Sequence, residues 1–265
     1  MTETLVYNGN LELGPEGDMV SVESFRRLLV VSAHAADFVW RAAGYIAVVT
    51  SAFGEAHVVC LSYGERGESP GAWRQPGMTL DRVKEIRREE ALAAAQVLGA
   101  TVHFLGKGDY PLPDDEPTVL ELAELMRALQ PGTILTHSVA DPYNGDHPKA
   151  AELTLRARVI AQAQGRESAH PPLGAPPVFR FEPHQPEMCG FKPEVLLDIT
   201  PVFDTKRKAM ECMAAQQHLW AYYTDLARRR GTQLRRNAGP NLGLPQSTLA
   251  EAYMRVFPQV ADRLA

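Results

Sequence analysis

The chain has 265 residues, of which 45% are hydrophobic and 22% are charged, so it can bury a large core and is typical of a soluble, enzyme-sized globular protein. Its formal net charge of -5 and pI near 5.9 argue against a general nucleic-acid binder, because such proteins need a concentrated basic surface. No stretch approaches the roughly 18 apolar residues of a membrane span, and the polar N-terminus lacks the pattern of a signal peptide.

Apolar, strand-like runs alternate with helical patterns after a polar leader over residues 1–24, which has room for a short strand at 5–7. The predicted strands are 28–32, 57–62, 102–105, 133–136, 178–181 and 195–199. The predicted helices are 37–52, 80–98, 118–129, 148–164 and 203–229. This order predicts an α/β protein with a Rossmann-like three-layer sandwich and a mostly parallel central sheet.

The simplest organisation is a single domain over residues 1–265, with a helical C-terminal extension over 218–265, because no repeat, low-complexity tract or linker interrupts the chain. Two stretches, 64–77 and 164–177, are dense in Pro and Gly and are predicted to be loops that wall a pocket. The three cysteines, Cys60, Cys189 and Cys212, lack CxxC spacing, so we expect neither a disulfide framework nor a thiolate zinc site. This cysteine usage fits a reducing cytoplasm.

Three side chains are candidate metal ligands. His34 and Asp37 lie three residues apart where the first predicted strand gives way to a helix, and His147 follows the fourth predicted strand. The carboxyl ends of parallel strands form the ligand crevice of an open α/β sheet. Catalytic zinc sites use about three protein ligands and an open position. Taken singly, these residues are equally explained as a buried hydrogen-bonded histidine, a helix N-cap and a residue of a first helical turn.

The chain resembles the PIG-L or LmbE-like family of metal-dependent deacetylases from about residue 27 to 217. The family pattern is Ala-His-Pro-Asp-Asp-Glu after the first strand, Gly-Glu-x-Gly after the second and His-Pro-Asp-His after the fourth. The matching stretches are Ala-His-Ala-Ala-Asp-Phe at 33–38, Gly-Glu-Arg-Gly at 64–67 and Asn-Gly-Asp-His at 144–147. The resemblance implies that His34, Asp37 and His147 bind a divalent metal, which is usually zinc in this family.

Three departures from this pattern affect the chemistry. The first Asp of the family's doublet, which is the general base of the deacetylases, is Ala36 here, the following Glu is Phe38, and the first His of the last motif is Asn144. A methyl group cannot take a proton from water, so the usual amide hydrolysis lacks its base although the ligand set is kept.

The altered pattern over 32–40, together with Glu-Pro-His-Gln-Pro at 182–186, resembles the branch of 4-oxalomesaconate hydratases, also called 4-carboxy-2-hydroxymuconate hydratases. These enzymes act in bacterial breakdown of gallate and protocatechuate. The resemblance implies a metal-dependent hydratase that adds water to a carbon–carbon double bond of a small anionic carboxylate substrate.

Glu65 and His184 are the predicted catalytic acid and base. Glu65 follows the second strand and is expected to reach a water at the metal, and His184 can titrate near neutral pH. Either residue is equally explained as an ordinary loop side chain, and Glu68 is predicted to be a surface charge. Asp146 is expected either to orient a ligand histidine or to cap a helix, and His137 is expected to be structural.

Arginines are the natural partners of substrate carboxylates, because the guanidinium group matches a carboxylate as a two-pronged donor. The densest positive cluster is at residues 228–236, and its plainer interpretation is a solvated helix end. From this cluster and from the region of the expected site, the predicted substrate-binding residues are Arg66, Arg180, Arg229 and Arg235. A contact between subunits would bring the cluster to the site, and we expect a homo-oligomer.

Three other functions compete with the hydratase. The first is a zinc-dependent N-deacetylase of an amino sugar or related amide, with Glu65 replacing the missing base. The second is a metal-binding protein without activity. The third is a non-haem iron oxygenase, whose facial triad has the same ligand types, but those ligands usually lie on a β-barrel and this chain has a βαβ pattern.

Overall fold

The computed structural model of the protein describes residues 27–238 and 243–259. Within these ranges, seven strands form one sheet in the order β3-β2-β1-β4-β5-β7-β6. The strands are β1 (Arg27–Ser32), β2 (Glu55–Cys60), β3 (Thr101–Phe104), β4 (Thr133–Thr136), β5 (Val178–Phe181), β6 (Val195–Asp198) and β7 (Ala250–Arg255). The helices are α1 (Asp37–Ser51), α2 (Pro70–Trp73), α3 (Leu80–Leu98), α4 (Glu116–Leu129), α5 (Asp146–Ala161), α6 (Phe203–Glu211) and α7 (Leu219–Ala238). The strand expected at 5–7 lies outside the described residues.

The strand order creates a crevice beside β1. Strands β1 to β5 are parallel, and β7 is antiparallel to both of its neighbours. From β1 the chain builds the sheet outward through β2 and β3, and then returns to the other side of β1 to form β4 and β5. A reversal of this kind leaves room for a ligand at the carboxyl ends of the two central strands.

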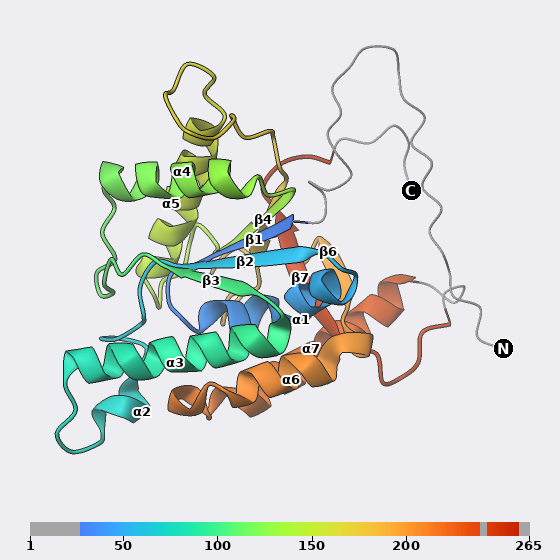
Figure 1. The fold of residues 1–265 in the computed structure, drawn as a ribbon. Helices are drawn as coiled ribbons and strands as arrows, with labels where there is room; N and C mark the ends of the chain where they lie inside the picture. Colours follow the sequence, from blue (N-terminus) through green and yellow to red (C-terminus); the bar gives the residue numbers. More distant parts are fainter. Residues whose placement is uncertain (1–26, 239–242, 260–265) are drawn as a thin grey trace, which may run out of the picture.

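Helices cover both faces of the sheet, which gives the three layers that the sequence predicted (Figure 1). Helices α1, α3, α6 and α7 pack on one face, and α4 and α5 pack on the other. The strand β1 is buried from Leu28 to Ser32 because it contributes side chains to both apolar layers. None of the helices in the described part of the chain has the length and apolarity needed to cross a membrane.

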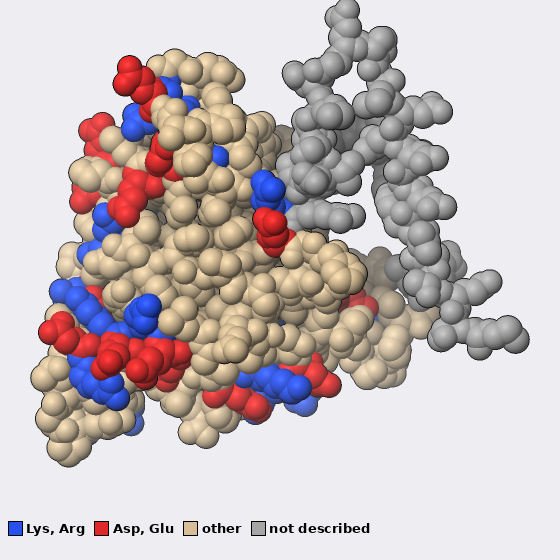
Figure 2. Space-filling view, in the orientation of Figure 1, with Lys and Arg blue, Asp and Glu red and all other residues tan. Residues whose placement is uncertain are grey.

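The helix α3 shows how local sequence signals set an element. Its start is capped by the hydroxyl of Thr79, which accepts a hydrogen bond from the Arg82 amide, and its end is Gly99 in the left-handed region with φ 67°. Its buried side faces the sheet, and mixed acidic and basic side chains cover the outer side (Figure 2). This helix is the amphipathic packing element that its pattern indicates.

Three elements differ from the prediction. The stretch 64–77, predicted to be a loop, contains the short helix α2. The helix expected over 203–229 is two helices, α6 and α7, separated by a 3-10 turn at Ala214–Gln216. The segment 218–265 is predicted to be helical, but it contains the strand β7. The first four residues of β7 are all buried, so polar and apolar residues do not alternate between solvent and core. Glu251 is buried there in an ion pair with Lys206, whose Nζ lies 2.6 Å from Oε1.

Candidate active site

The candidate metal ligands converge at the crevice beside β1. A sharp turn follows β1, and Asp37 begins α1 with its carboxylate folded back, so that Oδ2 accepts the amide of His34 at 2.8 Å. The N-cap position belongs to Ala36, so the interpretation of Asp37 as a helix cap is wrong. His34 Nδ1 lies 3.2 Å from Asp37 Oδ2, and both side chains are nearly inaccessible to solvent.

His147 reaches the same point from the start of α5. Its Nε2 lies 3.6 Å from Asp37 Oδ1, and its Nδ1 lies 2.8 Å from a carboxylate oxygen of Asp141. A carboxylate bound to one ring nitrogen orients a ligand histidine and leaves the other nitrogen for a metal. Asp141 is therefore the partner that positions His147, a role that its place in the loop after β4 did not reveal.

His137 is structural, as expected. Its Nε2 accepts a hydrogen bond from the Ala33 amide at 3.0 Å, and its ring stacks on that of His147 with centroids 4.2 Å apart. Because Nε2 accepts this amide, it does not carry a proton. His137 supports the turn after β1 and the ring plane of His147.

The three ligand residues fit a divalent metal. His34, Asp37 and His147 offer ligand atoms that all lie within 4.8 Å of one another. Both ring nitrogens of His34 and the Nε2 of His147 are buried without a hydrogen-bond partner among the described residues. Atoms bound to one zinc ion at 2.0–2.2 Å lie about 3–4 Å apart, which matches the spacings around Asp37.

The electrostatics of the cluster also favour a cation. Burial lowers the pKa of His34, but the nearby carboxylates of Asp146 and Asp37 outweigh burial and raise it to about 10. For Asp37, burial raises the pKa, but the imidazoles of His137 and His147 hold it well below its usual value. The buried carboxylates thus create a site where positive charge is stabilised.

Two adjoining cavities open beside these ligands. The larger has a volume of about 280 Å³ and includes His147 in its wall, and the smaller, of about 50 Å³, includes His34 and Asp37. Both are lined by the same five further side chains: Arg41, Glu68, His184, Gln216 and Leu219. A small ligand here would meet the metal ligands and these side chains together.

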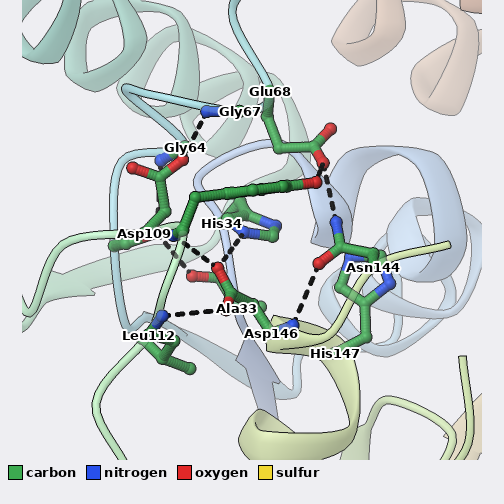
Figure 3. Close-up of polar contacts among 12 residues, drawn as sticks. Ala33, His34, Gly64, Gly67, Glu68, Asp109, Leu112, Asn144, Asp146 and His147 are labelled. Atoms are coloured by element: carbon green, nitrogen blue, oxygen red, sulfur yellow. Dashed lines mark hydrogen bonds and ion pairs between the residues drawn. The ribbon is translucent and has the colours of Figure 1, made fainter. Parts of the chain in front are cut away.

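Glu68, expected to be a surface charge, projects into this space (Figure 3). Its Oε1 accepts hydrogen bonds from Asn144 Nδ2 at 2.7 Å and from the Tyr110 hydroxyl at 3.1 Å. The loop that carries Glu68 is fixed by Asp109, whose carboxylate accepts hydrogen bonds from the backbone amides of Arg66 and Gly67. The position of Glu68 is therefore set from two sides.

Two amide side chains are oriented so that their NH2 groups face Glu68. Asn144 Oδ1 accepts the backbone amide of Asp146, which leaves Nδ2 for Glu68 (Figure 3). Gln216 Oε1 accepts hydrogen bonds from Trp40 Nε1 and Arg87 Nη2, both at 3.1 Å, and its Nε2 donates to Glu68 Oε2 at 3.3 Å. Gln216 reaches this position because the 3-10 turn between α6 and α7 breaks the helix there.

His184 follows β5 and lines both cavities. Its ring stacks on Tyr222 with centroids 4.4 Å apart, and its Nδ1 lies 3.1 Å from the Tyr223 hydroxyl. Burial, with a smaller effect from the positive charge of Arg41, lowers the pKa of His184 to about 4. Its imidazole is therefore neutral at pH 7.

Glu65 lies outside this cavity, which corrects the expectation that it reaches the metal site. Its side chain is fully buried, with Oε2 accepting the Tyr63 amide at 3.2 Å and Oε1 3.8 Å from Lys84 Nζ. It lines neither cavity. The two glutamates stand three positions apart in one loop, and the sequence alone gives no reason to prefer Glu68.

The predicted carboxylate-binding arginines also lie elsewhere. Arg66 donates to the Asp109 carbonyl, Arg180 is half-buried on β5, Arg229 is exposed and paired with Asp225, and Arg235 bonds to Gln246. None of the four lines either cavity. The arginine that does so is Arg41, one helical turn after Asp37 on α1, and the i, i+4 spacing is the signal that could have found it.

Asp146 is not a helix cap, because the N-cap position belongs to Gly145. Its carboxylate accepts the amides of Tyr110 and Leu112, both at 2.8 Å, and Oδ2 lies 3.5 Å from His34 Nε2 (Figure 3). Asp146 thus links the loop after β3 to a ligand histidine, which agrees with the expectation that it orients one.

This fold, with a His-Asp-His group at the carboxyl ends of β1 and β4, is that of an α/β enzyme with a candidate metal site. The sequence profile of the PIG-L family, described as GlcNAc-PI de-N-acetylase, matches residues 29–158, and the chain belongs to this family.

Two matches from Pseudomonas putida KT2440 resemble the chain over most of its length. The chain is 52% identical over 237 residues to a 4-oxalmesaconate hydratase of Pseudomonas putida KT2440. The matched region covers 89% of this chain and 92% of that protein. A crystal structure of GalB, the 4-carboxy-2-hydroxymuconate hydratase from the same organism, is 52% identical and superposes with a TM-score of 0.87, covering 90% of this chain and 99% of the other.

A more distant structure shares the fold alone. The N,N'-diacetylchitobiose deacetylase of Pyrococcus horikoshii is 20% identical, with a TM-score of 0.71 over 87% of this chain and 84% of that protein.

Proposed function

We propose that this protein is a metal-dependent hydratase that adds water across a carbon–carbon double bond of 4-carboxy-2-hydroxymuconate, also known as 4-oxalomesaconate, in the degradation of gallate or protocatechuate. The observation that carries the proposal is the cavity itself. Its two adjoining parts together combine the family's three ligands with Glu68 and His184, and Ala36 puts a methyl group where the deacetylases have their base. The hydratase relatives support the same substrate.

Each residue of the site is assigned one role in the reaction. A divalent cation held by His34, Asp37 and His147, which we take to be zinc, would supply Lewis-acid stabilisation of negative charge on substrate oxygens. Glu68 accepts a proton from water as the water oxygen bonds to one carbon of the double bond. Asn144 and Gln216 hold the carboxylate of Glu68 in place during this transfer.

His184 handles the proton at the neighbouring carbon, where the electron pair of the π bond forms the new C–H bond. Burial raises the pKa of the Tyr223 hydroxyl above its usual value, so this group keeps its proton, and its oxygen is assigned as the acceptor of the Nδ1–H of the neutral imidazole. Nε2 is then free to accept a proton. Glu68 passes the proton taken from water to His184 Nε2, and the imidazolium donates it to the carbon, so the hydroxyl group and the proton of one water molecule are both added and both side chains return to their starting forms.

The direct test is an assay of the zinc-loaded protein with 4-carboxy-2-hydroxymuconate, followed by the loss of diene absorbance in the ultraviolet. A parallel assay measures acetate release from N-acetylated amino sugars. The proposal expects fast loss of absorbance and no acetate. Robust acetate release without any loss of absorbance would instead support the deacetylase.

The cellular location that we propose is the cytoplasm. It is supported by the three cysteines, Cys60, Cys189 and Cys212, all of which are free thiols. The expectation of a homo-oligomer remains a prediction, which size-exclusion chromatography with light scattering tests.

A further inference from the structure

Arg41 is a buried cation whose hydrogen bonds are unused. Its residue is 8% exposed, and its Nε is buried without a hydrogen-bond partner among the described residues. The nearest carboxylate is Asp37, with Oδ1 3.7 Å from Nε, which is beyond hydrogen-bond distance. An arginine stays charged in proteins, and a buried charge without acceptors is costly.

The other buried cations among the described residues have acceptors of their own. Arg87 donates to Glu90 and Gln216, and Arg127 donates to three backbone carbonyls. Arg158 donates to the Pro176 carbonyl, and Lys206 donates to Glu251 and to a carbonyl. Each of these cations supports packing through its own acceptors. Arg41 is unlike them, so a purely structural role leaves its unpaired donors unexplained.

The surroundings of Arg41 show where its missing acceptor would lie. It lines both cavities of the site, beside Glu68 and His184. Among the described residues that line these two cavities, it is the single Lys or Arg. Its Cζ lies 5.9 Å from the centre of the Phe181 ring, which forms an apolar wall behind it. A ligand in the cavity is therefore in a position to supply the acceptor.

We propose that Arg41 binds a carboxylate of the substrate and makes the site selective for small polycarboxylates. This inference rests on the proposed function. The substrate 4-carboxy-2-hydroxymuconate carries three carboxylates by its chemical structure, and a guanidinium binds one through two parallel hydrogen bonds. A neutral N-acetyl sugar offers no such partner, so Arg41 selects against it.

The test compares two ligands that differ by one carboxylate. trans-Aconitate is mesaconate with a carboxylate added to its methyl group. Their dissociation constants are measured by calorimetry on the zinc-loaded wild type and on Arg41→Met. We expect the wild type to bind trans-aconitate about 10–100-fold more tightly, as for other charge-assisted hydrogen bonds, and we expect Arg41→Met to bind the two ligands nearly equally.

Kinetics of the muconate give a second readout. Arg41→Met should raise KM about 10–100-fold. Arg41→Lys, which keeps the charge but loses the two-pronged geometry, should raise it less and serves if the methionine variant fails to hold zinc. Arg156→Met, at an exposed ion pair with Asp114, is the matched control and should change neither readout.

An unchanged preference for trans-aconitate in a folded, zinc-loaded Arg41→Met protein would overturn the inference, as would an unchanged KM. If the wild type binds these ligands but does not hydrate the muconate, the proposed function fails instead. The calorimetric comparison still tests Arg41 in that case, because it needs no turnover.

Discussion

Glu68 and Glu65 belong to one loop but have different surroundings, which gives a matched pair of substitutions. Replacing Glu68 by Gln keeps its shape and removes the proton acceptor, so kcat for hydration should fall by about 10²–10⁴-fold. Replacing Glu65 by Gln changes a group outside both cavities and should lower kcat far less. Initial rates with metal analysis check this, and a similar loss in both variants would refute the assignment of Glu68.

The pH dependence of the reaction should reflect the lowered pKa of His184. Because this pKa is about 4, instead of the usual 6.5, the imidazole remains neutral as the pH falls from 7 to about 5. We expect kcat/KM to hold through pH 6.5 and to decline only nearer pH 4–5. Zinc content measured at each pH separates this effect from loss of the metal, and a decline centred at 6.5 with zinc retained would contradict it.

The same shift affects stability. Between pH 6.5 and 4 the unfolded chain protonates His184 more readily than the folded protein, so the free energy of unfolding contributed by this residue decreases as the pH falls.

The residues of the site were predictable to different degrees. His34, Asp37 and His147 are candidates because each follows a strand that ends at the same edge of the sheet, and the resemblance to the PIG-L family favours them over plainer interpretations. Glu68 and Gln216 were missed, since their positions depend on how a loop and a broken helix pack, and no periodic pattern records this. Arg41 is a lone arginine in the sequence, whereas the cluster at 228–236 is dense, and of that cluster Arg229 and Arg235 find partners at the surface.

At the scale of elements, the predicted strands β1 to β6 and most helices agree with the structure within one or two residues. Two of the exceptions, β7 and the break between α6 and α7, share a cause. Buried polar side chains, such as Glu251 in β7 and Gln216 in the turn before α7, interrupt the alternation and helical periodicity on which the predictions depend. Their partners, Lys206 and Arg87, come from distant segments, so the compensation becomes visible only in three dimensions.

The contact between α7 and the segment before β7 predicts a sensitive glycine. A Cβ atom at Gly231 would lie 1.8 Å from the Thr248 carbonyl oxygen, so the backbone of one element would have to move. Helix propensity alone favours Ala over Gly by about 1 kcal/mol. We nevertheless expect Gly231→Ala to lower the free energy of unfolding by about 1–3 kcal/mol, because of overpacking.

Urea unfolding of this variant provides the measurement. Gly165→Ala is the control, since a Cβ there meets nothing within 4 Å, and its unfolding midpoint should stay close to that of the wild type. If Gly231→Ala unfolds at a midpoint equal to or above the wild type, the close approach of α7 to Thr248 is not a constraint.

At the scale of the whole molecule, the metal should stabilise the fold. Its ligands join the turn after β1 to the start of α5, and a ligand present at 100 times its dissociation constant stabilises a protein by about 2.7 kcal/mol. Removing zinc with a chelator should therefore lower the melting temperature, and adding zinc back should restore it.

His147→Ala is the control for this measurement, because it lacks one ligand and should respond much less to added zinc. A wild-type melting temperature that is unaffected by chelation, in protein shown to have lost its metal, would refute a metal bound by His34, Asp37 and His147.

The residues of the site come from two parts of the polypeptide, one inside and one beyond the stretch that matches the family profile. The three candidate metal ligands lie before residue 150, within the stretch that matches the PIG-L profile, as do Ala36 and Glu68. His184, Gln216 and Tyr223 come from beyond it. A genome survey that sorted chains by the shared stretch alone would therefore detect the candidate ligands and the loss of the deacetylase base, but not the histidine proposed to protonate carbon. Inspecting the later residues would show whether His184 and its neighbours accompany that loss.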